Sequence, residues 1–306
     1  MSLKIIFMGT PNFSIPILES LLNSKHKILC VYTQSPKKKN RGQKENYTPV
    51  HEFAIKRKIG IRFPEILDTD EELNFIKKNK PDIVIVVAYG KIIPAKFLNI
   101  ENVKFINIHA SLLPKWRGAA PIQRSIMNSE KETGISIMKM TPELDAGPYM
   151  LQEKIPIEKE DDYESLSNKL SNLGSKLIIK SLDFIEKGDF KFTEQDNLIA
   201  TYAKKIDKTE SKIEWSKPAD NILAKVKGLS PFPGAWFLHK NNRLKIIKAE
   251  KISKNGKIGE ILSDDFVIGC GSGAIKIIAI QKEGKKILNT SSFLSGYKIK
   301  KGEFVN

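Results

Sequence analysis

The chain of 306 residues is poor in cysteine and has no long apolar run. Its two cysteines, Cys30 and Cys270, lie in apolar, strand-like surroundings and supply neither a disulfide framework nor a metal cluster. No segment approaches the roughly 18 uninterrupted apolar residues of a membrane span. The first residues read as a strand rather than as a signal peptide. We therefore expect a cytoplasmic protein with no metal site and no membrane contact.

The sequence also lacks the glycine pattern of a dinucleotide-binding turn. After Gly9, which ends an apolar run, come Thr-Pro-Asn-Phe-Ser instead of the later glycines of G-x-G-x-x-G. Without these glycines the backbone cannot approach the pyrophosphate of a dinucleotide closely enough to bind it, which argues against an NAD or FAD site. The glycine-rich stretch at 269–273 has no helix after it and is typical of a hairpin turn.

Positive charge is abundant, with a formal net charge of +16. Residues 204–306 hold 21 Lys and Arg against 10 Asp and Glu, whereas residues 1–203 hold 30 against 25. Most of these cations are lysine, and a lysine-rich composition can reflect the base composition of a genome. A concentration in the last third nevertheless favours a polyanionic partner such as nucleic acid.

Apolar runs and helical patterns alternate along the first part of the chain. The runs at 4–9, 27–33, 81–90, 103–109 and 133–140 are strand-like, and amphipathic stretches lie between several of them. This alternation predicts a doubly wound α/β domain with a mostly parallel sheet. Beyond residue 205 short runs separated by turn residues predict a small β-barrel or sandwich, such as an oligonucleotide-binding barrel. We expect domains at 1–188 and 206–306, joined by a linker at 189–205.

Two polar residues end one of the predicted strands. Side chains alternate along a strand, so Asn107 and His109 project to one face while Ile106 and Ile108 face the other. In α/β sheets ligands collect beyond the carboxyl ends of the strands, where this pair lies. The pair could simply anchor a loop, but convergent polar groups at such an edge favour a functional site.

Asp145 lies in a turn-rich loop after the strand at 133–140 and could be an ordinary turn residue. As a third member of the site it would orient His109 and raise its basicity. No Ser or Cys occupies a nucleophile's place, so these three residues suit a reaction whose substrate brings its own nucleophile. An amine attacking a carbonyl creates an oxyanion that Asn107 and protonated His109 could stabilise. His109 could also move the protons that such a transfer requires.

These residues resemble a known family. The run NIHASLLPKWRGAAPIQRSI, with TGISIMKMTPELDAGP downstream, is similar to the formyltransferases that use 10-formyltetrahydrofolate, whose shared core is Asn-x-His plus a later Asp. KIIFMGTPNFS, VVAYGKIIP, TYAKKIDKTESKIEWS and PFPGAWF extend the likeness over nearly the whole chain. They resemble most the bacterial branch that formylates methionyl-tRNA.

The resemblance implies a Rossmann-like formyltransferase domain followed by an OB-like barrel that helps to hold tRNA. It implies Asn107, His109 and Asp145 as catalytic residues, and Ser111, Leu112, Leu113 and Pro114 as a tetrahydrofolate-binding loop. It also implies that Arg41, Gly42 and Lys44 contact the tRNA acceptor end, although this loop is unusually rich in lysine.

The expected activity is transfer of the formyl group of 10-formyltetrahydrofolate to the α-amino group of methionyl initiator tRNA, by a monomer. The closest alternative is a sugar-nucleotide N-formyltransferase that uses the same folate donor. Such an enzyme would require neither the basic loop nor the basic C-terminal part. A catalytically inert RNA-binding protein with the same fold is the alternative from another class.

Overall fold

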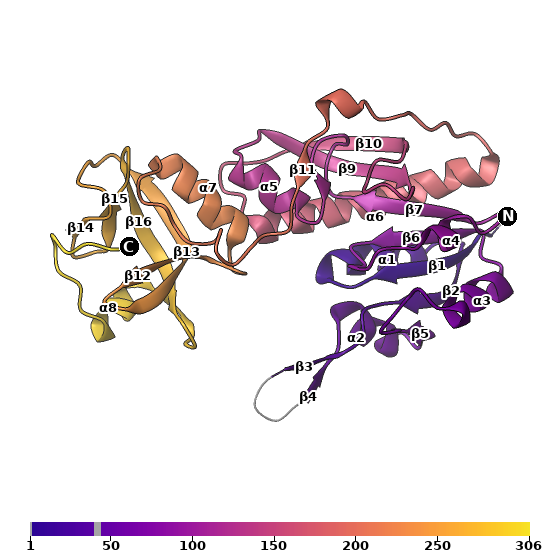
Figure 1. The fold of residues 1–306 in the computed structure, drawn as a ribbon, viewed down its shortest axis with the longest axis horizontal. Helices are drawn as coiled ribbons and strands as arrows, with labels where there is room; N and C mark the ends of the chain where they lie inside the picture. Colours follow the sequence, from indigo (N-terminus) through magenta and orange to yellow (C-terminus); the bar gives the residue numbers. More distant parts are fainter. Residues whose placement is uncertain (1, 40–43) are drawn as a thin grey trace. The chain divides into compact units, whose positions relative to one another are not determined.

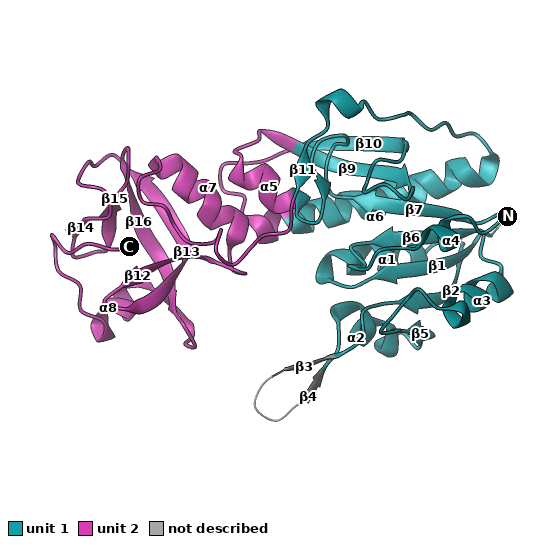
Figure 2. Cartoon of the chain, in the orientation of Figure 1, with its two compact units in different colours: residues 1–121, 133–155, 167–203 teal, residues 122–132, 156–166, 204–306 magenta. Residues whose placement is uncertain are grey.

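A computed structural model describes residues 2–39 and 44–306, which fall into two compact units (Figures 1 and 2). Unit 1 comprises residues 1–121, 133–155 and 167–203, and unit 2 comprises residues 122–132, 156–166 and 204–306. This division differs from the expected domain boundaries. Residues 122–132 and 156–166 cluster with unit 2, and most of the expected linker at 189–205 belongs to unit 1.

Unit 1 is built on a seven-stranded sheet in the order β10-β9-β7-β6-β1-β2-β5. Its strands are β1 (Lys4–Gly9), β2 (Lys27–Tyr32), β5 (Ile61–Arg62), β6 (Ile83–Val87), β7 (Lys104–His109), β9 (Glu132–Lys139) and β10 (Tyr149–Pro156). The five neighbours from β7 to β5 run parallel, and β9 runs antiparallel to β7. The predicted α/β class with a mostly parallel sheet is therefore confirmed.

The central strands are apolar on both faces. Every residue of β6 is buried, as are five of the six residues of β1. Parallel strands are linked by crossovers that place helices over both faces of the sheet, so such strands read as continuous rather than alternating apolar runs. This is why the run at 81–90 predicted a buried strand.

Helices follow the strands of unit 1 (Figure 1). They are α1 (Ile15–Leu22), α2 (Pro49–Lys56), α3 (Asp70–Asn79), α4 (Ala95–Leu98) and the long α6 (Tyr163–Lys187), of which residues 167–187 belong to this unit. A Cβ added at Gly174 of α6 would lie 3.2 Å from Ile108 and 3.3 Å from Ile17. Gly174 thus allows α6 to pack closely on β7 and α1, against the face of β7 that carries Ile108.

A short hairpin of β3 (Lys37–Lys39) and β4 (Lys44–Asn46) follows β2. Lys44 opens β4, whereas Arg41 and Gly42, the other expected tRNA contacts, lie outside the described residues. Among the helices that the structure describes, none has the length and apolar composition to cross a bilayer.

Unit 2 carries an antiparallel sheet in the order β12-β13-β16-β15-β14, with β17 paired to β16. Its elements are α5 (Pro121–Met127, from residue 122), α7 (Ala219–Leu229), β12 (Ala235–His239), β13 (Asn242–Ile252), β14 (Ile261–Ser263), β15 (Val267–Gly269), β16 (Ala274–Lys282), β17 (Ile287–Asn289) and α8 (Thr290–Gly296). Edge-to-face aromatic pairs of Phe237 with Trp215 and with Phe266 lie in its core. The expectation of short strands after residue 205 is confirmed, and the structure shows that they pair antiparallel.

A buried ion pair joins α3 to the sheet of unit 1. The Glu72 carboxylate, 6% exposed, accepts hydrogen bonds from the Arg62 guanidinium at 2.7 and 2.8 Å and from the Tyr32 hydroxyl at 2.7 Å. Burial alone would raise the pKa of Glu72, but the hydrogen bonds from Arg62 and Tyr32 outweigh it and hold that pKa below its ordinary value. The ion pair therefore stabilises the fold above the ordinary pKa of Glu and loses this effect as the pH falls through the lowered pKa.

We expect Arg62→Met to destabilise the protein by about 3–5 kcal/mol at neutral pH, because it leaves the buried Glu72 carboxylate unpaired. The loss should shrink as the pH falls, because burial without Arg62 raises the pKa of Glu72 in the variant, so that its carboxyl becomes protonated first and no longer needs a cation. Urea unfolding of the wild type and the variant, at neutral and at acidic pH, measures the difference in their free energies of unfolding. Arg57→Met is the control, since the Arg57–Glu19 pair is nearly half exposed and should contribute at most about 1 kcal/mol. Equal losses in the two variants would contradict the expectation.

Candidate active site

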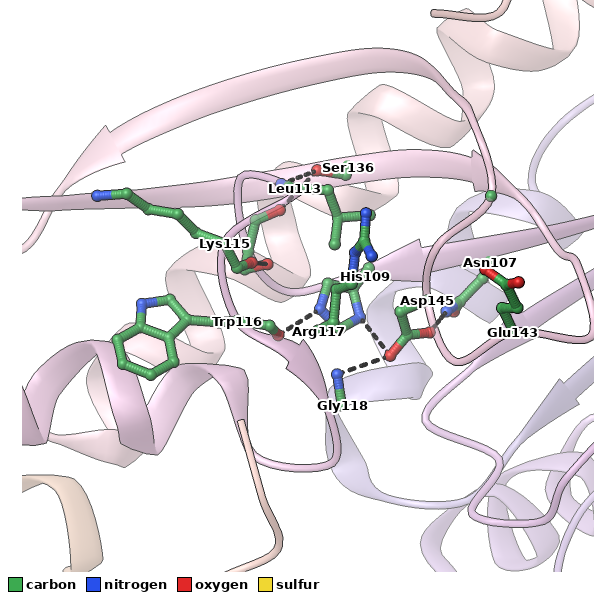
Figure 3. A network of polar contacts seen from close by, with 12 residues as sticks. Asn107, His109, Leu113, Lys115, Trp116, Arg117, Gly118, Ser136, Glu143 and Asp145 are labelled. Carbon is green, nitrogen blue, oxygen red and sulfur yellow. Dashed lines mark hydrogen bonds and ion pairs between the residues drawn. The ribbon is translucent and has the colours of Figure 1, made fainter. Parts of the chain in front are cut away.

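Asn107 and His109 lie at the carboxyl end of β7 and point to the same side of the sheet (Figure 3). Ile108, between them, faces the opposite side and packs on α6. The alternation predicted from the sequence is therefore present in the structure. Asn107 is partly exposed, whereas the His109 side chain is 5% exposed.

Asp145 lies between these two side chains (Figure 3). Its Oδ1 accepts a hydrogen bond from Nδ2 of Asn107 at 3.2 Å, and its Oδ2 lies 3.6 Å from Nδ1 of His109. Oδ2 also accepts a hydrogen bond from the backbone N–H of Gly118 at 2.8 Å. The structure thus brings together the three residues that the sequence analysis selected, although 36 residues separate His109 from Asp145.

The imidazole of His109 is held by a contact that the sequence analysis missed. Its Nε2 lies 2.9 Å from the backbone carbonyl of Trp116. A carbonyl only accepts, so Nε2 carries the proton of that bond and Nδ1 faces Asp145. Nδ1 is then the nitrogen that can gain or lose a proton during a reaction. Asp145 lies too far from Nδ1 for a direct hydrogen bond, and the ring orientation depends mainly on Trp116.

The backbone around the site is held in uncommon conformations. Trp116 and Asp145 have φ angles of 60° and 47°, in the left-handed region that costs a residue other than glycine about 1–2 kcal/mol. Gly118 has a φ of 122°, and a Cβ there would lie 2.8 Å from the carbonyl oxygen of Ala203. Such strain persists where surrounding contacts enforce it, and it is common at functional sites.

The contacts that enforce this backbone come from the end of the expected linker. Strand β11 (Tyr202–Ala203) pairs with β8 (Arg117–Gly118). Thr201 accepts from the backbone N–H of Trp116 through its hydroxyl at 2.9 Å, and from that of Arg117 through its carbonyl at 2.9 Å. A composition-based reading cannot detect this pairing, because Thr201 lies in a polar stretch 84 residues after Arg117 in sequence.

The loop Ser111–Pro114 is held by its own hydrogen bonds and by Ser136 of β9. The Ser111 hydroxyl donates to the carbonyl of Lys115 at 2.5 Å. The Ser136 hydroxyl donates to the Ser111 carbonyl at 2.6 Å and accepts from the Leu113 N–H at 3.1 Å. Ser111 and Leu113 are buried, so Leu112 and Pro114 are the loop side chains with exposed surface.

Large apolar side chains remain exposed at the same edge of the sheet. Ile92, in the loop after β6, is 90% exposed, and Leu144, next to Asp145, is 65% exposed. Exposed apolar side chains at the same edge as a polar cluster are typical of binding sites for small molecules. Within residues 2–39 and 44–306, no three His, Cys, Asp or Glu side chains gather to hold a metal ion.

Comparisons with known proteins agree over the full length of the chain. Residues 3–182 match the formyl transferase family, and residues 205–298 match the formyl transferase C-terminal domain. A methionyl-tRNA formyltransferase of Pelagibacter ubique is 52% identical over 304 residues, covering 99% of this chain and 98% of the relative. One of Bartonella quintana is 43% identical over 306 residues, covering 98% and 99%.

Among solved structures, the sugar 3N-formyl transferase WlaRD shares the fold with a TM-score of 0.66 at 21% identity. The match covers 94% of this chain and 100% of WlaRD. The chain therefore belongs to the formyl transferase family.

Ser136→Ala should destabilise the protein by about 1–3 kcal/mol, because it leaves the buried N–H of Leu113 and the carbonyl of Ser111 without their partner. Thermal and urea unfolding measure the loss. Ser175→Ala is the matched control: its hydroxyl donates to a carbonyl within its own helix, and its removal should cost less than about 0.5 kcal/mol. A Ser136 variant as stable as the control would show that this hydroxyl does not hold the loop.

Proposed function

We propose that this chain transfers the formyl group of 10-formyltetrahydrofolate to the α-amino group of methionyl initiator tRNA. The observation that carries the proposal is the convergence of Asn107, His109 and Asp145 at the carboxyl end of β7, in a chain similar over its whole length to proteins named methionyl-tRNA formyltransferase. The hydroxyl that lies nearest to His109 along the chain is that of Ser111. It is buried and donates to a carbonyl, so it is not placed to act as a nucleophile. The nucleophile is thus supplied by the acceptor.

The folate donor supplies the carbon that is transferred, and the described residues fit such a ligand. Leu112, Pro114, Ile92 and Leu144 offer apolar surface for its planar ring, next to the polar cluster. We propose that the loop Ser111–Pro114 binds the folate chiefly through its backbone and these exposed side chains. The Ser111 hydroxyl and the Leu113 side chain act indirectly, by holding the loop in shape.

Asn107 and His109 lie where they can stabilise negative charge on the formyl oxygen. As the amine forms its bond to the formyl carbon, the carbonyl oxygen becomes an oxyanion. Nδ2 of Asn107 can donate a hydrogen bond to it, as can Nδ1 of His109 once the imidazole has taken up the proton of the amine. The attacking amine must lose a proton, and the departing nitrogen of the donor must gain one. Nδ1 of His109 can move this proton, and the Asp145 carboxylate stabilises the imidazolium in between.

Unit 2 presents basic and aromatic side chains that support an RNA partner. The Arg243 guanidinium lies 4.1 Å from the ring centroid of Trp236, and the Lys212 ammonium lies 6.0 Å from it. Phe232 is 77% exposed, with the Lys245 ammonium 5.9 Å from its ring. Cations attract phosphates and exposed rings stack on unpaired bases. We propose that residues 206–306 bind the tRNA body and that Arg41, Gly42 and Lys44 contact its acceptor end.

We further propose that the protein acts as a monomer in the cytoplasm. The decisive experiment supplies 10-formyltetrahydrofolate with charged initiator tRNA, charged elongator tRNA or an amino-sugar nucleotide. Formylation of the initiator tRNA, with much less on the elongator, is expected. Modification of the sugar alone would identify a sugar-nucleotide N-formyltransferase, and tRNA binding without any transfer would identify an inert RNA-binding protein.

Asn107→Ala should lower kcat for the initiator tRNA at least about a hundredfold, because it removes one donor to the oxyanion. Steady-state kinetics with both substrates measure the effect. The control is Asn79→Ala, which removes an amide that bonds a carbonyl at the end of α3 and should change kcat less than about twofold. A kcat within tenfold of the wild-type value would exclude Asn107 as an oxyanion donor.

Phe232→Ala should weaken the binding of initiator tRNA about fivefold to a hundredfold, the range of one lost base–aromatic stack. Fluorescence anisotropy at fixed salt measures the dissociation constant. Phe304→Ala is the control, since Phe304 is also exposed in unit 2 but none of the cations that the structure describes lies over its ring. If both variants bind tRNA as the wild type does, Phe232 makes no such stack.

A further inference from the structure

A buried arginine next to the site is held by two side chains of the segment at 193–203. Arg117 is 3% exposed. Its Nε donates to Oε1 of Gln195 at 2.9 Å, and a terminal nitrogen donates to Oδ1 of Asn197 at 2.8 Å. Both partners are neutral amides. The bonds join β8 to a segment about 80 residues later in the chain, which passes beside the site residues.

The Gln195 amide connects this arginine to the loop that carries Asp145. Gln195 is 8% exposed, and its Nε2 donates to the carbonyl of Asp145 at 2.8 Å and to the carbonyl of Gly147 at 2.6 Å. A guanidinium only donates, so the amide oxygen of Gln195 must face Arg117 and its NH₂ group must face the two carbonyls. The network therefore fixes the orientation of the amide without ambiguity.

The loop needs such a contact because its conformation is unfavourable. Asp145 occupies the left-handed region, at a cost of about 1–2 kcal/mol. It lies outside the regular strands, between β9 and β10. Its carboxylate contacts Asn107, His109 and the N–H of Gly118, but these bonds depend on where the backbone of Asp145 lies. Gln195 is the side chain that holds this backbone.

We propose that Gln195 is a positioning residue for formyl transfer: oriented by Arg117, it fixes the backbone of residues 145–147 so that the Asp145 carboxylate faces Asn107 and His109. Figure 3 shows Arg117 beside these site residues. The inference rests on the proposed function for its kinetic consequence. Its structural part, the restraint of the Asp145 loop by Gln195, holds for any reaction that this site performs.

Two variants of Gln195 and one of Asn197 test the proposal. Gln195→Ala removes both donations to the loop and should lower kcat about tenfold to a hundredfold, with the KM of each substrate changed less than about threefold, because a misplaced catalytic group mainly slows the chemical step. Gln195→Glu keeps an acceptor for Arg117 but places an oxygen against two carbonyls. It should show the same loss of kcat while remaining folded.

Asn197→Ala is the matched control. Asn197 accepts from the same guanidinium, but in the described part of the chain it makes no hydrogen bond to residues 145–147. The kcat of the variant should therefore stay within about threefold of the wild-type value. Loss of kcat in the Asn197 variant as large as that in the Gln195 variants would show a general effect of the segment and overturn the proposal. So would a normal kcat in Gln195→Glu.

A double-mutant cycle separates positioning from general stability. If Gln195 acts through Asp145, Gln195→Ala should lower kcat less than about threefold in an Asp145→Ala background, because the group that it positions is already gone. An equal loss in both backgrounds would overturn the proposal, since a purely structural effect would be additive.

Hydrogen exchange of the peptide spanning 141–148 gives a readout that does not depend on activity. Exchange should be faster in Gln195→Ala than in the wild type and unchanged in Asn197→Ala. Unchanged exchange in Gln195→Ala would overturn the proposal. If the wild type formylated no methionyl-tRNA, the proposed function would fail, while hydrogen exchange would still decide whether Gln195 restrains this loop.

Discussion

The arrangement of the site depends on the partly buried carboxylate of Asp145, which requires hydrogen-bond donors. The Asp145 side chain is 14% exposed. Nδ2 of Asn107 and the backbone N–H of Gly118 donate hydrogen bonds to its two oxygens, and Nδ1 of His109 lies 3.6 Å from Oδ2. A polar group that is partly removed from water costs free energy unless it is hydrogen-bonded, so these donors stabilise the carboxylate in this place. These donors come from β7 and from the turn that contains β8, so the carboxylate joins parts of the chain that are distant in sequence.

Strand β7, helix α6 and the turn that contains β8 place those donors. The parallel sheet ends β7 at the edge where side chains of the following loops converge. Close packing of Gly174 on Ile108 holds the apolar face of β7 against α6, which leaves Asn107 and His109 on the opposite face. Two backbone groups also contact these side chains: the Trp116 carbonyl orients the His109 imidazole, and the Gly118 N–H donates to the Asp145 carboxylate. The candidate site thus combines two side chains of a rigid strand, Asn107 and His109, with a loop residue, Asp145.

The segment at 193–203 is part of the surroundings of the site. It falls within the linker expected at 189–205. In the structure it pairs with β8 and reaches the loop of Asp145 through Gln195. A segment of this kind owes its order to tertiary hydrogen bonds rather than to its own propensity, and such bonds leave no periodic signal in the sequence. The last residues before unit 2 are thus part of the scaffold of the site.

Local patterns in the sequence were sufficient for the longer strands of the parallel sheet, for the shared face of Asn107 and His109, and for the short strands after residue 205. These features follow from periodicity and from continuous apolar runs, which a single stretch of sequence contains. The same patterns missed the two-residue strand β5 at the edge of the sheet. The Trp116 carbonyl, the left-handed backbone of Asp145 and the Arg117–Gln195 contact were decided only by the tertiary structure. They involve backbone groups and residues about 80 positions apart, and only the folded chain brings such groups within hydrogen-bond distance.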